Sequence, residues 1–170
     1  HVYAKLPAPT TTNANSNWVN SIGYALLEQI DLEIGGHRID RQYGLWLDIW
    51  NELTDPSNRE WKLVGKKSDP TASAPNGLVS RQQNVTEYHI PLKFWFCGKP
   101  GLALPLIALQ HQDIVLKINI RSRAGCLLNQ TNAITDFGSD SITDFKIYAD
   151  YIYLDHDERR KFASMDHEYL

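Results

Sequence analysis

The chain has 170 residues and a formal net charge of −3 at pH 7, with 42% hydrophobic and 22% charged residues. These values fit about one globular domain and exclude the disordered and fibrous classes. Because its 17 Lys and Arg are scattered among 20 Asp and Glu, the chain has no basic stripe, and we expect no direct binding to nucleic acid. No apolar run approaches the roughly 20 residues of a membrane span, so no span is expected.

Aromatic residues are prominent, with five Trp and eight Tyr. Such large rings fill protein cores and also anchor protein interfaces, which favours a protein that works by assembling with partners. The two cysteines, Cys97 and Cys126, have no paired spacing and no zinc-binding pattern around them. They predict free buried thiols and a reducing compartment.

The two ends of the sequence predict a longer natural protein. Residues 2–6 alternate apolar and polar side chains, as in a strand that is entered midway, and the chain opens on His1 rather than Met. At the other end it finishes on the apolar pair Tyr169-Leu170. We therefore expect the protein to extend beyond both ends.

A strand and hairpin are predicted in the first half of the chain, where Ile30, Leu32 and Ile34 alternate with polar residues. This period of two indicates a half-buried strand. Gly35-Gly36 can take the positive φ angles of a tight turn, and residues 38–41 form the predicted return strand.

From residue 43 the period changes to that of a helix. Tyr43, Trp46, Trp50 and Leu53 recur at spacings of three and four residues, with Leu47 beside them, which predicts a short helix over residues 43–53 with an aromatic face. Because aromatic residues most often fill cores, we expect Trp46 and Trp50 to close one end of a β core.

The rest of the chain predicts a long surface loop followed by three strands. Residues 55–86 are polar and rich in proline, which indicates the loop, and its Lys66-Lys67 pair is interpreted as solvated surface. Short strands with irregular connections and one helix predict an all-β antiparallel sandwich or jelly roll. The three strands are residues 88–97, placed at a sheet edge by Pro91, residues 114–121, and residues 145–154, which are apolar on both faces.

No motif indicates catalysis, a cofactor or a metal site. The sequence has no glycine-rich phosphate loop, nucleophile elbow, HExxH or CxxC spacing. The acidic cluster at residues 155–158 is followed at once by Arg159, Arg160 and Lys161, so we interpret it as an exposed helical turn or loop rather than a cation site. Asn84 and Asn129 match the weak pattern for N-glycosylation.

Several blocks of the sequence resemble the major capsid proteins of large nucleocytoplasmic DNA viruses, and they occur in the same order as in that family. The resemblance spans nearly the whole chain, with residues 55–86 and 124–141 as loops that carry no recognisable motif. The matching blocks are residues 22–26, 33–36, 39–40, 42–53, 91–97, 100–109, 151–155 and 158–160.

The resemblance implies that residues 1–170 form a single jelly-roll domain of the viral capsid type, the truncated first half of a tandem double jelly roll. It also implies trimeric, pseudo-hexagonal capsomers that tile an icosahedral shell. The implied partners are other copies of the chain, neighbouring capsomers and minor capsid proteins, and the implied location is a virion assembled in the host cytoplasm.

Two other classes stay open from the residues alone. A carbohydrate-binding jelly roll would use exposed aromatic residues on a concave sheet, and a cupin-type metalloenzyme would need clustered histidines, which the sequence lacks. If the chain assembles, we expect loop residues such as Trp18 and Trp61 to make the contacts between subunits. Trp46, Trp50 and Trp95 are instead expected to lie mainly within the domain.

Overall fold

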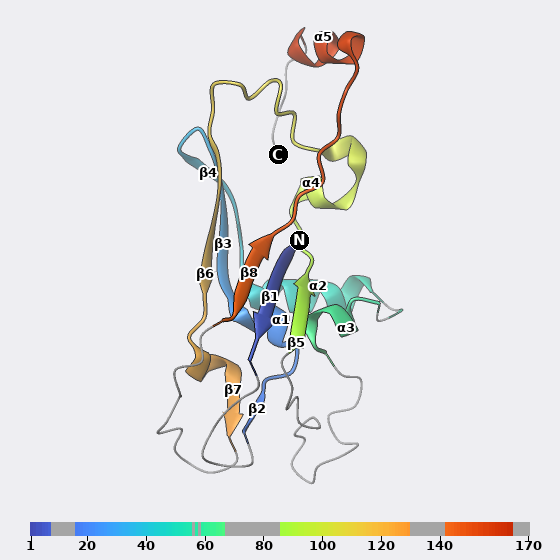
Figure 1. The fold of residues 1–170 in the computed structure, drawn as a ribbon. Helices are drawn as coiled ribbons and strands as arrows, with labels where there is room; N and C mark the ends of the chain where they lie inside the picture. The colour runs from blue at the N-terminus through green and yellow to red at the C-terminus, as the bar shows by residue number, and fades with distance from the viewer. Residues whose placement is uncertain (8–15, 56, 58, 67–85, 130–141, 165–170) are drawn as a thin grey trace.

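The computed structural model describes residues 1–7, 16–55, 57, 59–66, 86–129 and 142–164. Within these residues the strands form three antiparallel sheets with orders β5-β1-β8, β2-β7 and β4-β3-β6. In Figure 1 the sheet β5-β1-β8 lies in front of helices α1 and α2, and the sheet β4-β3-β6 stands to its left. The predicted all-β antiparallel class is therefore confirmed.

The sheet β4-β3-β6 contains the predicted hairpin. Strand β3 (Leu27–Ile34) pairs with β4 (His37–Gln42) through a turn in which Gly35 has φ +57° and Gly36 has φ +81°. Side chains with a Cβ rarely adopt such angles, which explains the two glycines. On its other edge β3 pairs with β6 (Ile114–Ile120), so that aliphatic residues of both strands lie opposite one another. These pairs join Ile30 to Ile118, Leu32 to Leu116 and Ile34 to Ile114.

An ion pair across the hairpin fixes β3 to β4. The guanidinium of Arg41 donates to both carboxylate oxygens of Asp31, with Nε–Oδ1 and Nη2–Oδ2 distances of 2.7 and 2.8 Å. Gln29 Nε2 donates a third bond to Asp31 Oδ2, at 3.0 Å. Because the Arg41 side chain donates to it, the pKa of Asp31 lies below its ordinary value.

We expect Asp31→Asn to lower stability at neutral pH and to lose this effect in acid. A carboxylate with a lowered pKa stabilises the fold fully above its unfolded pKa of about 4, and loses that contribution as the pH falls through the lower folded value. Urea midpoints for parent and variant should differ at pH 7 and converge toward pH 3. Asp150→Asn, at an exposed position, is the control and should leave the midpoint unchanged at every pH.

The sheet β5-β1-β8 differs from the prediction in the length of two strands. Strand β5 (Thr86–Ile90) lies at the sheet edge, as Pro91 indicates, but it ends before that proline because proline cannot donate a ladder bond. The predicted continuation to residue 97 is wrong, since residues 95–98 form a helical turn, α4 (Trp95–Gly98). Strand β1 (Val2–Leu6) lies in the centre, between β5 and β8 (Asp144–Ile147).

The predicted strand at residues 145–154 is also mostly wrong. Strand β8 ends at Ile147, and the segment after it runs extended toward the helix α5 (His156–Ser164). The side chains of Tyr151, Ile152 and Tyr153 are 68%, 55% and 86% exposed. A segment with apolar side chains on both faces can be a strand that its own chain covers, or a segment that a partner covers. The sequence pattern does not distinguish the two.

The remaining elements are short helices and the small sheet β2-β7. The helix predicted over residues 43–53 is confirmed as α2 (Gly44–Thr54), and the acidic cluster opens the exposed helix α5. Besides α4, the helices α1, in the first block that resembles the family, and α3, within the expected loop, were not predicted. The bounds of the other elements are β2 (Ser16–Trp18), α1 (Ile22–Leu26), α3 (Trp61–Val64), η1 (Pro100–Leu102), η2 (Arg123–Cys126) and β7 (Leu127–Asn129).

One apolar core joins the sheets and the helices α1 to α3. It draws side chains from both three-stranded sheets, including Val2, Ile30 and Ile90, each 0% exposed. Tyr24 of α1 and Leu47 of α2 are buried in the same cluster. The helices therefore close one side of the β core, and they also present a second surface to the outside.

Candidate assembly surfaces

Helix α2 buries a different face from the aromatic one predicted. Gly44, Leu47 and Asn51 point into the domain, and Leu47 and Asn51 are 0% exposed. Trp46 and Trp50, expected in the core, are 44% and 40% exposed, and their ring centroids lie 5.5 Å apart on the outer face. The assignment of these two tryptophans to the core is therefore wrong.

The sequence also contains the residues of the inward face, as a second series with helical spacing. Residues 44, 47 and 51 follow the same spacing of three and four as the aromatic series, but two of them are Gly and Asn, which hydrophobicity alone does not select. Their burial follows from close contact at Gly44. A Cβ at Gly44 would lie 2.0 Å from the carbonyl oxygen of Tyr24 and 2.2 Å from that of Leu27.

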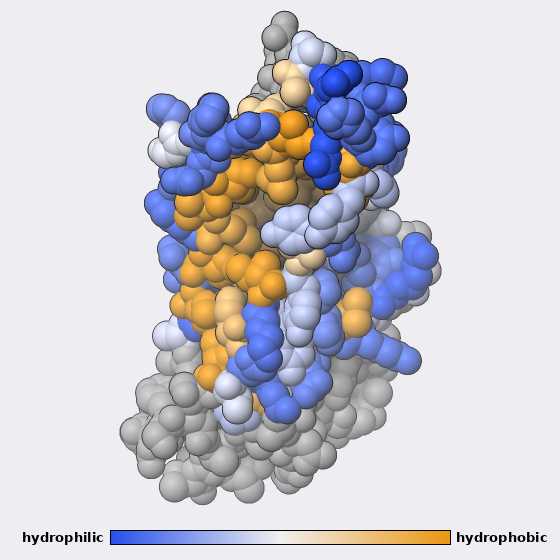
Figure 2. Space-filling model, turned by 45° about the horizontal axis from the view of Figure 1, so that its top comes forward, coloured by the Kyte–Doolittle hydropathy of each residue, from blue (hydrophilic) through white to orange (hydrophobic). Residues whose placement is uncertain are grey.

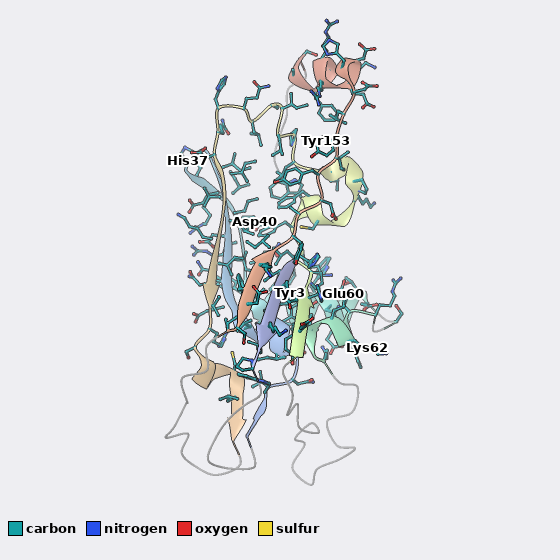
Figure 3. All side chains as sticks on the ribbon, viewed as in Figure 1. Tyr3, His37, Asp40, Glu60, Lys62 and Tyr153 are labelled. Carbon is teal, nitrogen blue, oxygen red and sulfur yellow. The ribbon has the colours of Figure 1, made fainter. Side chains whose placement is uncertain are left out.

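A polar cluster around Glu60 ties α2 to its neighbours. Its carboxylate accepts hydrogen bonds from Tyr24 Oη at 3.0 Å and from Asn51 Nδ2 at 2.9 Å. Lys93 Nζ donates to both of its oxygens, at 2.6 and 2.8 Å. Burial, together with the nearby negative charge of Glu60, raises the pKa of Tyr24 above its ordinary value, which keeps this hydroxyl a donor. Figure 3 labels Glu60 beside β5 and the helices.

We expect Glu60→Ala to destabilise the protein by about 2 kcal/mol, because the change leaves the partly buried Lys93 ammonium and two polar groups without their acceptor. Urea unfolding monitored by far-UV circular dichroism measures the loss. Glu87→Ala removes a carboxylate of the same type from an exposed pair with Lys5, and it should leave the midpoint unchanged. Equal effects of the two substitutions would contradict the role assigned to Glu60.

Lys66 also fixes α2, which corrects its interpretation as solvated surface. Its side chain is 7% exposed, and its ammonium donates to Asp48 Oδ1 at 3.0 Å and pairs with Glu52. The same ammonium lies 5.6 Å from the centroid of the Trp61 ring. The acidic residues of α2 are thus held against α3. Lys67 lies outside the described residues.

A second exposed apolar region lies at the other end of the molecule. Figure 2 shows apolar side chains gathered between the hydrophilic end of the β3–β4 hairpin and the hydrophilic helix α5. An open hollow of about 560 Å³ lies here between residues 106–110, residues 151–154 and α5. Tyr153, labelled in Figure 3, lies on the segment leading to α5, well away from Glu60.

Helix α5 bounds this hollow with an N-terminal capping box. Asp155 Oδ1 accepts from the Glu158 backbone N–H at 2.8 Å, and Glu158 Oε2 accepts from the Asp155 backbone N–H at 3.4 Å. The two carboxylates therefore cap the helix. Among the described residues no group of three His, Cys, Asp or Glu is arranged to hold a metal ion, and no helix in the same part of the chain is long and apolar enough to cross a bilayer.

The structure separates the two tryptophans predicted to contact other subunits. Trp18 is 7% exposed and belongs to the core, so little of its side chain is open to a partner. Trp61 is half-buried in α3, and its Nε1 is buried without a hydrogen-bond acceptor among the described residues. Trp95 is partly buried against the core, as expected. Whether Trp18 or Trp61 touches another subunit stays a prediction.

The structure tests the predicted thiols but not the predicted glycosylation sites. Asn84 lies outside the described residues, and Asn129 ends β7, so glycosylation of either stays a prediction. Both cysteines are free thiols, as predicted. Cys126 is buried, whereas Cys97 is exposed because it lies in α4 rather than in a strand, which corrects its predicted burial.

Comparison with known proteins relates this chain and its fold to one family. A family model described as the major capsid protein N-terminus matches residues 3–155. The chain belongs to this family. The major capsid protein of Phaeocystis pouchetii virus is 40% identical over 181 residues, which cover 91% of this chain and 35% of that protein. The major capsid protein of Paramecium bursaria Chlorella virus 1 is 36% identical, covering 85% of this chain and 31% of that protein.

The structural comparison gives the same family and confirms the jelly-roll fold. A chain in the quasi-atomic model of the PBCV-1 virus capsid matches with a TM-score of 0.74 and 27% identity, over 99% of this capsid-family chain and 38% of the other. The chain thus spans about a third of the length of the relatives it matches. Among the described elements, helix α5 lies wholly outside residues 3–155, so the family match covers nearly all of the fold described here.

Proposed function

We propose that the protein is a structural subunit of the icosahedral shell of a large double-stranded DNA virus and works by assembly rather than catalysis. The observation that carries this proposal is the match of residues 3–155 to the major capsid protein N-terminus. It agrees with the exposed apolar side chains of α2 and of residues 147–153. Such side chains on a folded domain mark surfaces that other proteins cover.

The proposed assembly unit is a trimer of double jelly rolls. The described domain would be the first roll, and a second roll would lie in the further length that the relatives have. Three such subunits would form a pseudo-hexagonal capsomer, which contacts neighbouring capsomers and minor capsid proteins in a shell assembled in the host cytoplasm. A closed ring of identical copies requires only one kind of contact repeated three times.

Expression of the full-length protein tests this proposal. Analytical ultracentrifugation should give a mass three times that of one chain, and electron microscopy should show pseudo-hexagonal particles. In purified virions, quantitative mass spectrometry should find the protein among the most abundant shell components. A full-length chain that stays monomeric at high concentration and is absent from the shell would overturn the proposal.

The carbohydrate-binding alternative gains no support from the described residues. The exposed aromatic side chains of α2 and of residues 148–153 lie on a helix and on an extended segment. A carbohydrate-binding jelly roll places such rings on a concave sheet face. Glycan-array binding by the isolated protein would restore this alternative.

A further inference from the structure

Helix α2 carries apolar side chains on two opposite faces. Leu47, on the inner face, lies in the domain core. The outer face carries Leu45, Trp46, Ile49, Trp50 and Leu53, which recur at spacings of three and four residues and so form one continuous stripe. A helix that is apolar on both sides is typical of a buried position, yet the described residues cover only one side of α2.

The outer stripe is large enough to be one side of a stable interface. Its five side chains are between 40% and 74% exposed, and Tyr43 just before the helix is 47% exposed. Large apolar side chains at these exposures present on the order of 600 Å² of surface, whereas one partner in a standard interface buries about 800 Å². The stripe alone therefore supplies most of what a specific contact needs.

The stripe is also held rigidly before any partner binds. The start of α2 packs at Gly44 against two backbone carbonyl oxygens, and Asn51 donates a hydrogen bond to Glu60. Lys66 forms ion pairs with Asp48 and Glu52 beside the stripe. A preorganised surface loses little conformational entropy on binding. The ion pairs of Lys66 with Asp48 and Glu52 also offset part of the negative charge at the border of the stripe.

We propose that the outer stripe of α2, defined as Leu45, Trp46, Ile49, Trp50 and Leu53, is a contact surface for a second copy of this chain. This inference rests on the proposed function, since a shell subunit meets further copies of itself at high local concentration. The aromatic content of the stripe matches the centres of protein interfaces, where Trp and Tyr are enriched. It replaces Trp18 and Trp61 by Trp46 and Trp50 as the principal contact tryptophans.

The experiment uses the full-length protein with the photo-crosslinking amino acid benzoylphenylalanine at position 49. Chains labelled with ¹⁴N and ¹⁵N are mixed, assembled and irradiated, and the crosslinked peptides are identified by mass spectrometry. We expect peptides that pair α2 of one isotope with a segment of the other. Crosslinks only between peptides of one isotope would overturn the inference, because the chain's own further residues would then cover the stripe.

A double variant, Trp46→Ser with Trp50→Ser, gives a second measurement. Because both rings point outward, its unfolding midpoint should stay close to that of the parent, while assembly should require at least a tenfold higher protein concentration. Val115→Ser, an exposed aliphatic position on β6, is the control and should assemble as the parent does. Normal assembly of the double variant would overturn the inference and leave the proposed function standing, whereas failure of the parent itself to assemble refutes the proposed function.

Discussion

Gly44→Ala should destabilise the protein by about 3 kcal/mol or more. The substitution removes no interaction, and the whole loss comes from the steric clash of the added methyl group. The added methyl would lie 2.0 and 2.2 Å from the carbonyl oxygens of Tyr24 and Leu27. Both obstacles are backbone atoms and cannot rotate away, so α2 must move off α1. Its outward stripe would then move with it.

Chemical unfolding and assembly assays together measure this effect. The urea midpoint should fall, and the variant should also assemble poorly because α2 no longer presents its outer face in the right position. Gly98→Ala is the matched control, since a Cβ there meets nothing within 4 Å. If Gly44→Ala and Gly98→Ala left stability equally unchanged, the close approach of α2 to α1 would be wrong.

Leu47→Ala and Leu45→Ala should differ sharply although the two residues are neighbours on one helix. Leu47 is 0% exposed and Leu45 is 69% exposed. Truncating the buried leucine removes core contacts and leaves a cavity, at a cost of about 2–5 kcal/mol. Truncating the exposed one should change the unfolding free energy of the unassembled chain by less than about 0.5 kcal/mol.

This pair decides which face of α2 is inward. Unfolding of the unassembled protein should show the loss for Leu47→Ala alone, and assembly should be weakened by Leu45→Ala. If the aromatic face pointed into the core, as the sequence pattern predicts, Trp46→Ala rather than Leu47→Ala would carry the large loss of stability. The two substitutions thus separate folding from assembly within a single helix.

Different parts of the domain hold helix α2 in place and remain exposed to solvent. The core and the Glu60 cluster fix α2 in position, and the outer stripe of α2 stays open to solvent. The hollow beside α5 is a separate apolar region at the opposite end. A subunit with two such regions has the features needed to meet neighbours on more than one side.

Local patterns in the sequence determined the hairpin, the helix α2 and the strand β6. The alternation at Ile30, Leu32 and Ile34 and the pair Gly35-Gly36 specify β3 and its turn, because period and positive φ are properties of the backbone itself. The helix at residues 44–54 and the strand β6 follow from period in the same way. The family resemblance read from the sequence is confirmed by the family model and the structural match.

Only the tertiary structure decided which side of each apolar segment is buried. Helix α2 carries two apolar faces, and the choice between them depends on whether its backbone can approach α1 at Gly44. Residue spacing within the helix does not reveal this contact, because it joins α2 to a different element. The segment after Ile147 is apolar, yet strand β8 ends at Ile147, and beyond it Tyr148 exchanges two hydrogen bonds with His1. Hydrophobicity measures the preference to leave water, and it does not tell whether the same chain or a partner provides the cover.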